Sequence, residues 1–268
     1  MPELVQTCIA SWHTYMPDWE YRLWTEDTIA QVLCQPTPSH CSMNVHSGYS
    51  IEQSSSPIKG GENESAPNPS QNWLDYMPRY VQEAYAAKKY AFVSDYVRLW
   101  ALERDGGLYM DVDFEVYKSF DDLMEQYDAF AGYEGSKRNP IMMGVIAASA
   151  HHPWIQGMMA TYETREFVKD DGSLDMTPNT AYFLQWMQER GFVADGVEKD
   201  WIGVHVLPVE YFCPGLTTGE NLRCERTYCE HKGLHSWSGN GGWKARLLNI
   251  VPQRWKTKLI KLKRKILK

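Results

Sequence analysis

The stretch "AFVSDYVRLWALERDGGLYMDVDFEV", residues 91–116, decides the fold. Its first half has the apolar periodicity of a helix, and Gly106-Gly107 is a strong stop signal. The aromatic and apolar run "LYMDVDFEVY" that follows the glycines is typical of a strand. A helix, a tight turn and a strand in this order predict one unit of an α/β sheet.

Two aspartates, Asp111 and Asp113, stand one residue apart in this strand. A side-chain period of two puts both carboxylates on one face, where they repel each other unless a cation lies between them. Mg²⁺ or Mn²⁺ is the hard ion that takes oxygen ligands and leaves positions open for phosphate oxygens. An Asp-x-Asp alone is weak evidence, because chance pairs are common and a solvated strand end explains them equally.

The preceding helix adds Asp95 and Arg98, which are three residues apart and therefore lie on one helical face. As a surface ion pair they would contribute only about 0.2–0.5 kcal/mol. The layer geometry of α/β folds, however, brings the end of the strand near the start of that helix. The two residues and the aspartate pair are therefore expected to share one crevice.

The remaining pattern alternates helices and strands, which favours an α/β sheet with helices on both faces. Residues 80–104 are too long for one regular helix and predict two, with Ser94 as a candidate cap of the second. Further helices are predicted at 3–15, 121–128, 153–165 and 178–190, and further strands in "WEYRLWTED", "AFAGYE" and "IMMGVIAAS".

Two segments differ from this pattern and set the domain boundaries. Ser, Pro, Gly and Asn fill 21 of the 38 positions from 35 to 72, a composition that predicts a disordered or loosely held insertion. The 23 residues 246–268 hold 9 of the 27 basic residues and no acidic one. We therefore expect one domain over residues 1–245 and a basic tail over 246–268.

In the tail, Trp255, Leu259, Leu262 and Ile266 recur with helical spacing among lysines and arginines. A basic amphipathic helix with a tryptophan is typical of a segment that binds an anionic membrane surface. A solvated, frayed C-terminus is the alternative. The tail therefore predicts either a segment that holds the protein on the cytoplasmic leaflet of a membrane or a frayed terminus.

Charge and composition exclude several classes of protein. Without the tail the chain carries 18 basic and 34 acidic side chains, and this acidic body argues against nucleic-acid binding. There is no run of about 18 apolar residues and no secretory signal at the N-terminus. The six cysteines follow no zinc or disulfide-scaffold spacing, which favours reduced thiols and a cytoplasmic location.

The compound pattern S-D-x-x-R followed by G-G-x-Y-x-D-x-D closely resembles the sugar-binding region of glycosyltransferase family 32, whose members share a DxD motif. That family includes bacterial capsular-polysaccharide and yeast mannosyl transferases, with the glucosyltransferase domains of large clostridial toxins as more distant relatives. The resemblance implies a type-A glycosyltransferase fold, a single Rossmann-like domain with a mixed sheet. It also implies a nucleotide-sugar donor, a divalent metal ion and transfer with retention of configuration.

The resemblance assigns roles to the residues of the motif. Asp113 resembles the main metal ligand, and Asp111 the residue that links the metal to the ribose. Asp95 and Arg98 match the positions that hold the donor sugar and its phosphates. Tyr109 falls among the donor-binding residues. All but Tyr109 are expected to take part in catalysis.

Near the C-terminus the family shows a histidine followed by Ser-Trp, which here are His231, Ser236 and Trp237. The resemblance makes His231 the candidate third metal ligand, with Ser236 and Trp237 at the donor. By chemistry alone His235 is an equally good ligand. Trp237 is a stacking lid over the donor or a core residue, with equal weight.

The sequence therefore predicts a metal-dependent transferase that moves a sugar from a UDP- or GDP-sugar to a polysaccharide or lipid-linked glycan. Relatives usually begin with a further strand that contacts the base, and this sequence starts at the helix that follows it, so the first strand is expected to be missing. A catalytically inactive, glycosyltransferase-like binding module is therefore the main alternative. A phosphohydrolase with Asp111 as nucleophile and Asp113 as acid/base ranks lower, because that chemistry normally uses the first strand of a domain.

Overall fold

The structure is a computed structural model that describes residues 2–33, 72–135, 140–215, 222–233 and 247–252. The predicted insertion, apart from Asn72, and the tail after Pro252 lie outside the described residues. The helices are α1 (Glu3–Tyr15), α2 (Glu26–Leu33), α3 (Arg79–Ala86), α4 (Tyr90–Asp105), α5 (Asp121–Gln126), α6 (Pro153–Ala160) and α7 (Asn179–Gln188), with short 3₁₀ turns η1 (Trp73–Tyr76) and η2 (Val209–Tyr211). The strands are β1 (Trp19–Trp24), β2 (Gly107–Met110), β3 (Phe114–Val116), β4 (Ala129–Tyr133), β5 (Ile141–Ala148), β6 (Lys199–Trp201), β7 (Val204–Leu207), β8 (Cys229–His231) and β9 (Leu247–Pro252).

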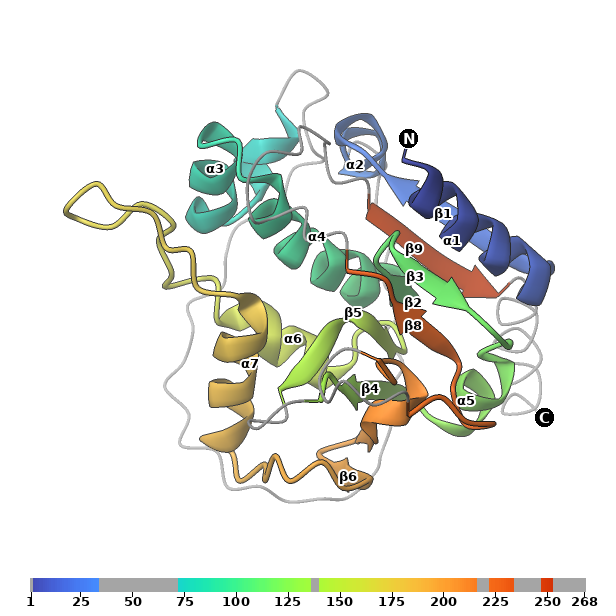
Figure 1. The fold of residues 1–268 in the computed structure, drawn as a ribbon. Coiled ribbons are helices and arrows are strands. Elements are labelled where there is room, and N and C mark those ends of the chain that lie inside the picture. The colour runs from blue at the N-terminus through green and yellow to red at the C-terminus, as the bar shows by residue number, and fades with distance from the viewer. Residues whose placement is uncertain (1, 34–71, 136–139, 216–221, 234–246, 253–268) are drawn as a thin grey trace, which may run out of the picture.

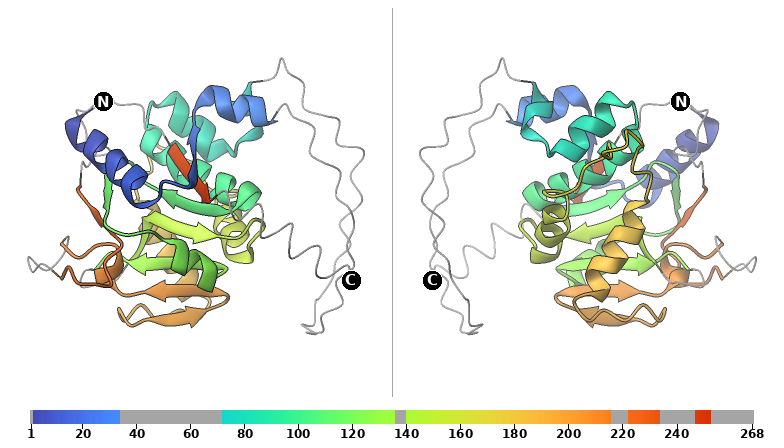
Figure 2. Two further views of the ribbon diagram at one scale, coloured as in Figure 1. Left: turned by 90° about the vertical axis from the view of Figure 1, so that its right-hand side faces the viewer. Right: turned by 90° about the vertical axis from the view of Figure 1, so that its left-hand side faces the viewer.

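Seven of the described strands form one sheet in the order β1-β9-β2-β5-β4-β7-β6, while β3 and β8 form a second sheet of two strands. Figures 1 and 2 show β1 and β9 at the end of the large sheet near α2, and β6 at the opposite edge. Within that sheet β4 and β7 are the parallel neighbours, and the other described pairs are antiparallel. The α/β class with a mixed sheet is therefore confirmed.

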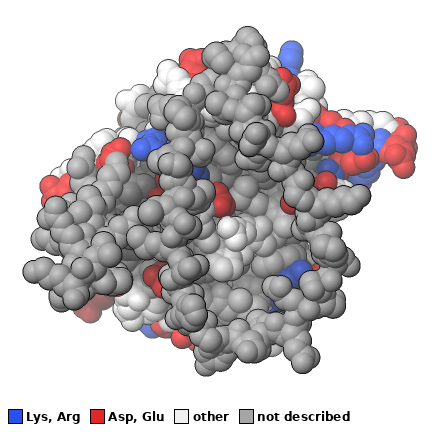
Figure 3. Space-filling model, turned by 180° about the vertical axis from the view of Figure 1, so that it is seen from behind, with Lys and Arg blue, Asp and Glu red and all other residues white. Residues whose placement is uncertain are grey.

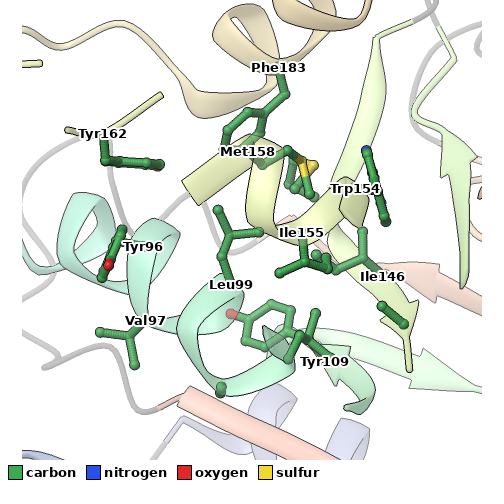
Figure 4. Close-up of a cluster of buried hydrophobic side chains, with 14 of the residues drawn as sticks. Tyr96, Val97, Leu99, Tyr109, Ile146, Trp154, Ile155, Met158, Tyr162 and Phe183 are labelled. Carbon is green, nitrogen blue, oxygen red and sulfur yellow. The ribbon is translucent and has the colours of Figure 1, made fainter. Parts of the chain in front are cut away.

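Side chains from the two faces of the large sheet enter two separate apolar clusters. In β5, Ile141, Met143 and Ile146 join the first cluster, and Met142 and Val145 join the second. The first cluster lies under α2, α3, α4, α6 and α7, and Figure 4 shows its centre between α4 and α6. The second lies under α1, α5 and the β3–β8 sheet. Helices thus cover both faces.

The turn between α4 and β2 requires glycine. Gly106 ends α4 with a φ of 65°, a conformation that other residues rarely adopt. A Cβ at this position would also stand 2.6 Å from the backbone nitrogen of Ala150. The turn therefore packs tightly against the loop after β5, and it aims β2 directly at the centre of the sheet.

Helix α1 holds β3 in place through two hydrogen bonds. The buried indole Nε1 of Trp12 donates to the carbonyl oxygen of Phe114 over 2.7 Å. The hydroxyl of Ser11 accepts a bond from the backbone N–H of Val116 over 2.8 Å. These bonds satisfy one edge of β3 while β8 satisfies the other.

The structure corrects several predictions about elements. "LYMDVDFEVY" is not one strand, because β2 ends at Met110 and β3 begins at Phe114 in the other sheet. Helices α3 and α4 are separate as predicted, but the boundary lies at residues 87–89 and Ser94 is buried inside α4. Helix α6 ends at Ala160, so the helix predicted at 153–165 is shorter.

Residues 161–178 form an irregular arm between α6 and α7 instead of the end of that helix. The arm projects from the body (Figure 1) and carries acidic and basic side chains side by side (Figure 3). The predicted tail also changes: its residues Leu247–Pro252 form β9, which lies between β1 and β2.

In the described part of the chain, no helix is both long enough and apolar enough to span a bilayer. The described cysteines, Cys8, Cys213, Cys224 and Cys229, carry free thiols.

Candidate functional site

The aspartate pair lies in a turn where the chain passes from the large sheet to the small one. The backbone N–H of Asp111 donates to the carbonyl oxygen of Gly144 over 2.8 Å, which extends the pairing of β2 with β5 by one residue. The N–H of Phe114 then bonds the carbonyl oxygen of Asp111 over 3.2 Å and closes the turn. The turn, rather than the alternation of a single strand, positions both carboxylates.

Arg98 is the centre of the α4 side of the site. Its side chain is 6% exposed, and its Nη2 lies 2.8 Å from Asp95 Oδ1 and 3.6 Å from Asp111 Oδ1. Its Nη1 donates to the carbonyl oxygen of Met143 over 2.6 Å. The guanidinium carbon stands 4.5 Å from the centre of the Tyr109 ring, a cation–π contact. The predicted grouping of Asp95, Arg98 and Asp111 is therefore present.

Burial dominates the electrostatics of both carboxylates that face Arg98. It raises the pKa of Asp95 to about 7, although the charges of Arg98 and Arg165 act to lower it. It also raises the pKa of Asp111, against the lowering effect of Arg98 and of the Tyr109 hydroxyl, which donates to Asp111 Oδ1. The positive charges and hydrogen bonds around these carboxylates thus offset only part of the cost of burying them, a situation that is common at functional sites.

Gly144 makes room for this arrangement. A Cβ at position 144 would lie 2.9 Å from Asp111 Oδ2 and 2.7 Å from Cε2 of Phe114. Even an alanine methyl group would therefore push the carboxylate or the ring away. Gly144 lies inside β5, within the predicted strand "IMMGVIAAS", and forms the floor beneath Asp111.

Asp113 meets His231 on the other side of the turn. His231 Nε2 lies 3.0 Å from Asp113 Oδ2, and the imidazole stacks on Phe114 with ring centres 4.7 Å apart. The register of the small sheet places Phe114 opposite His231. Burial lowers the pKa of His231, but the hydrogen bond and charge of Asp113, with the charges of Asp111 and Glu134, raise it above its ordinary value.

Lys232 fixes the strand that carries His231. Its backbone N–H donates to the carbonyl oxygen of Asp113 over 2.9 Å. Its ammonium group lies 2.8 Å from Glu115 Oε2 and 2.8 Å from Glu230 Oε2. These two glutamates stand opposite each other in the register of β3 and β8, so the lysine cancels a repulsion that would otherwise separate the strands.

Sequence reasoning missed two charged residues near the site. Glu134 follows β4, and its charge interacts with those of His231 and Asp111. Arg165, on the arm, is enclosed by three tyrosine rings, of which Tyr182 is the closest at 3.6 Å, and its charge lowers the pKa of Asp95. A carboxylate at the end of the predicted strand "AFAGYE" was a signal for the first, while nothing in the sequence pointed to Arg165.

The fit of a metal ion can be judged from the donors that are described. Two aspartates suit Mn²⁺ or Mg²⁺, and an imidazole is a donor that transition metals accept. Among the described residues, however, no group of three His, Cys, Asp or Glu side chains is gathered so that it could hold a metal ion. Ser236, Trp237 and the alternative ligand His235 lie outside the described residues. The donor types fit, and the metal site stays a prediction.

Comparison with known families gives one match. Residues 2–130 match the family model described as a glycosyltransferase sugar-binding region containing a DXD motif. The match supports this glycosyltransferase family. It begins before α1 and ends within β4, and it therefore includes Asp95, Arg98 and both aspartates of the turn, but not His231. Neither the curated proteins nor the solved structures gave a match to the chain. The mixed α/β sheet is consistent with a type-A glycosyltransferase fold.

Proposed function

We propose that the protein is a metal-dependent glycosyltransferase that transfers a sugar from a UDP- or GDP-sugar to a glycan acceptor with retention of configuration. The observation that carries the proposal is the contact between Asp113 and His231, which are 118 residues apart and meet at 3.0 Å beside the Asp95–Arg98–Asp111 group. A carboxylate, an imidazole and a buried guanidinium around one turn suit a nucleoside diphosphate.

Each residue has a distinct part in this proposal. Arg98 would neutralise the diphosphate as a fixed donor, because Asp95 and the carbonyl oxygen of Met143 orient its guanidinium. Asp95 would accept hydrogen bonds from hydroxyl groups of the donor sugar. Asp111, Asp113 and His231 would hold Mn²⁺ or Mg²⁺, which when bound stabilises the charge on the departing nucleoside diphosphate.

The proposal extends to the acceptor and the location of the protein. We infer a polysaccharide or lipid-linked glycan acceptor in the cytoplasm, with residues 253–268 as the segment that contacts an anionic membrane. The support is the spacing of Trp255, Leu259, Leu262 and Ile266 among basic residues. The test is sedimentation with phosphatidylglycerol vesicles of the full chain and of a chain ending at residue 252, which keeps β9. Equal sedimentation of the two removes the membrane proposal.

The decisive experiment is a panel of UDP- and GDP-sugars incubated with the full chain, with Mn²⁺ or with a chelator. Release of nucleoside diphosphate should require the metal ion and should fall at least about a hundredfold in Asp113→Asn. Asp171→Asn, at the exposed tip of the arm, is the matched control and should match the native rate. The configuration of the product, followed by NMR, tests retention.

Other outcomes identify the alternatives. Release of phosphate from simple phosphomonoesters that is lost in Asp111→Asn would instead indicate a phosphohydrolase. Binding of a nucleoside diphosphate without turnover would indicate the inactive binding module. No binding of any nucleotide by calorimetry would remove the glycosyltransferase proposal itself.

A further inference from the structure

The backbone of β4 directs Glu134 toward the small sheet. Phe130 belongs to the second apolar cluster and Tyr133 to the first, so the side chains of β4 alternate between the two faces. Gly132 faces the second cluster, since a Cβ there would lie 2.5 Å from the Phe212 ring. The N–H of Glu134 continues the pairing by donating to the carbonyl oxygen of Pro140 over 2.8 Å. Glu134 therefore points to the same side as Gly132.

That side of the sheet is where the β3–β8 pair carries His231. Phe114, on which His231 stacks, belongs to the second cluster together with Cys213. The charge of Glu134 acts on both Cys213 and His231. The alternation of side chains along β4 and the charge interactions of Glu134 both indicate that its carboxylate faces the turn of the aspartate pair from the β4 side.

The Glu134 carboxylate is half-buried and has no hydrogen bond or ion pair within the part of the chain that is described. The nearby glutamates differ: Glu115 and Glu230 are each bound by Lys232, and the Tyr117 hydroxyl lies within hydrogen-bonding distance of both and can donate to either. Burial of an unpartnered carboxylate is costly, and proteins retain such groups mainly where a ligand supplies the partner. Glu134 therefore has the surroundings of a ligand-binding residue, and Glu115 those of a structural one.

The chemistry of the ligand follows from the charge. A carboxylate accepts hydrogen bonds and repels phosphate, so Glu134 suits neutral hydroxyl groups and not the diphosphate. Asp95 and Arg98, which would hold the donor, belong to α4. This helix packs on the first cluster, on the opposite side of the turn. We propose that Glu134 binds a hydroxyl group of the glycan acceptor. This inference rests on the proposed glycosyltransferase function and adds an acceptor residue to it.

The test compares the full chain with Glu134→Gln, which keeps the size of the side chain and removes its charge. Nucleoside diphosphate binding with Mn²⁺ is measured by calorimetry, donor hydrolysis by nucleoside diphosphate release, and transfer with a panel of nitrophenyl glycosides. Glu189→Gln, at the exposed end of α7, is the control. Calorimetry and hydrolysis should change less than about twofold, while kcat/KM for the glycoside should fall about tenfold or more through a higher KM, the loss expected for a hydrogen bond to a charged group.

The outcomes separate this inference from the function on which it rests. An unchanged transfer rate in Glu134→Gln, or no glycoside used by the native chain, overturns the acceptor role alone. A lower melting temperature together with weaker nucleotide binding in Glu134→Gln also overturns it, because Glu134 would then be structural. If the native chain binds no nucleoside diphosphate, the proposed function fails, and the acceptor role fails with it.

Discussion

The carboxylate of Asp111, at the end of β2, and the carboxylate of Glu83, on α3 beside the arm, are both partly buried, but their surroundings differ. Burial raises the pKa of Asp111, and the contacts with Arg98 and Tyr109 do not offset it. Burial also acts to raise the pKa of Glu83, yet hydrogen bonds from the backbone of Val168 and Phe167 and from Arg79 lower it below the ordinary value.

The difference separates structural charges from charges held for a ligand. Glu83 accepts hydrogen bonds of 2.8 and 2.9 Å from the N–H groups of Phe167 and Val168. The protein thus supplies hydrogen-bond donors for this carboxylate, and these bonds attach the arm to α3. Asp111 contacts Arg98 and the Tyr109 hydroxyl through Oδ1, while its Oδ2, beside Gly144, has no such donor in the described part of the chain. Replacing Glu83 should therefore lower the stability of the fold, whereas replacing Asp111 should mainly weaken ligand binding.

The largest expected effect is that of Arg98→Met. The substitution removes a buried cation and leaves Asp95, 15% exposed, and Asp111, 33% exposed, without it. Breaking a buried charge pair from one side typically costs about 3–5 kcal/mol. Urea unfolding at neutral pH measures it. Arg190→Met is the matched control, since Arg190 is 47% exposed over Trp186 and should cost at most about 0.5 kcal/mol. Equal losses in the two variants would contradict the central role of Arg98.

Glu83→Ala should be the next most destabilising change, by about 1–3 kcal/mol at pH 7, because two N–H groups of the arm lose their acceptor. The pKa of Glu83 is lowered, so its contribution is present above the unfolded value of about 4.5 and is lost as the pH falls through the folded pKa. The difference in unfolding free energy between native and variant should thus shrink below pH 4.5. A difference that grows on acidification would reverse the sign assigned to Glu83.

Local patterns predicted the elements that depend on neighbours in sequence. Helical periodicity predicted α1 and the division into α3 and α4. It also predicted that Asp95 and Arg98, which are one helical turn apart, form an ion pair. The break between β2 and β3 was missed because strand-like apolar and aromatic residues continue through the turn. The sequence pattern therefore does not reveal that the chain changes sheets. Ser94 looked like a cap, but its hydroxyl is buried and bonds Arg98 Nη2.

Long-range pairing accounts for most of what the sequence left open. Leu247–Pro252 was grouped with the basic tail by charge, although it inserts between strands more than a hundred residues away. His231 was singled out only by family resemblance, because no local rule connects it to Asp113. Glu134 and Arg165 received no role because their significance lies in which charges surround them, and burial and charge are properties of the folded chain.

Gly144→Ala and Gly132→Ala compare crowding inside and outside the site. Both methyl groups meet a close neighbour, Asp111 and Phe114 in one case and the Phe212 ring in the other, and each should cost about 1–3 kcal/mol. Only the first displaces the Asp111 carboxylate. Calorimetry with Mn²⁺ and nucleoside diphosphate should show weaker binding in Gly144→Ala alone. Equal weakening in both would mean that general loss of packing, and not the position of Asp111, controls binding.

Asp111→Asn should have the smallest effect on stability and a large effect on binding. Because the folded pKa of Asp111 is raised, its ionisation removes stability as the pH rises from its unfolded value of about 3.8 through the folded pKa, and the amide lacks this loss. The asparagine can still accept the Tyr109 hydroxyl bond, and Arg98 keeps Asp95. The free energy of unfolding at pH 7.5 should therefore stay within about 1 kcal/mol of native or rise. Nucleoside diphosphate binding with Mn²⁺ should fall at least about tenfold, because the bound ligand would lose its contact with the charged carboxylate of Asp111. A variant that unfolds as easily as Arg98→Met would place Asp111 among the structural charges, beside Glu83.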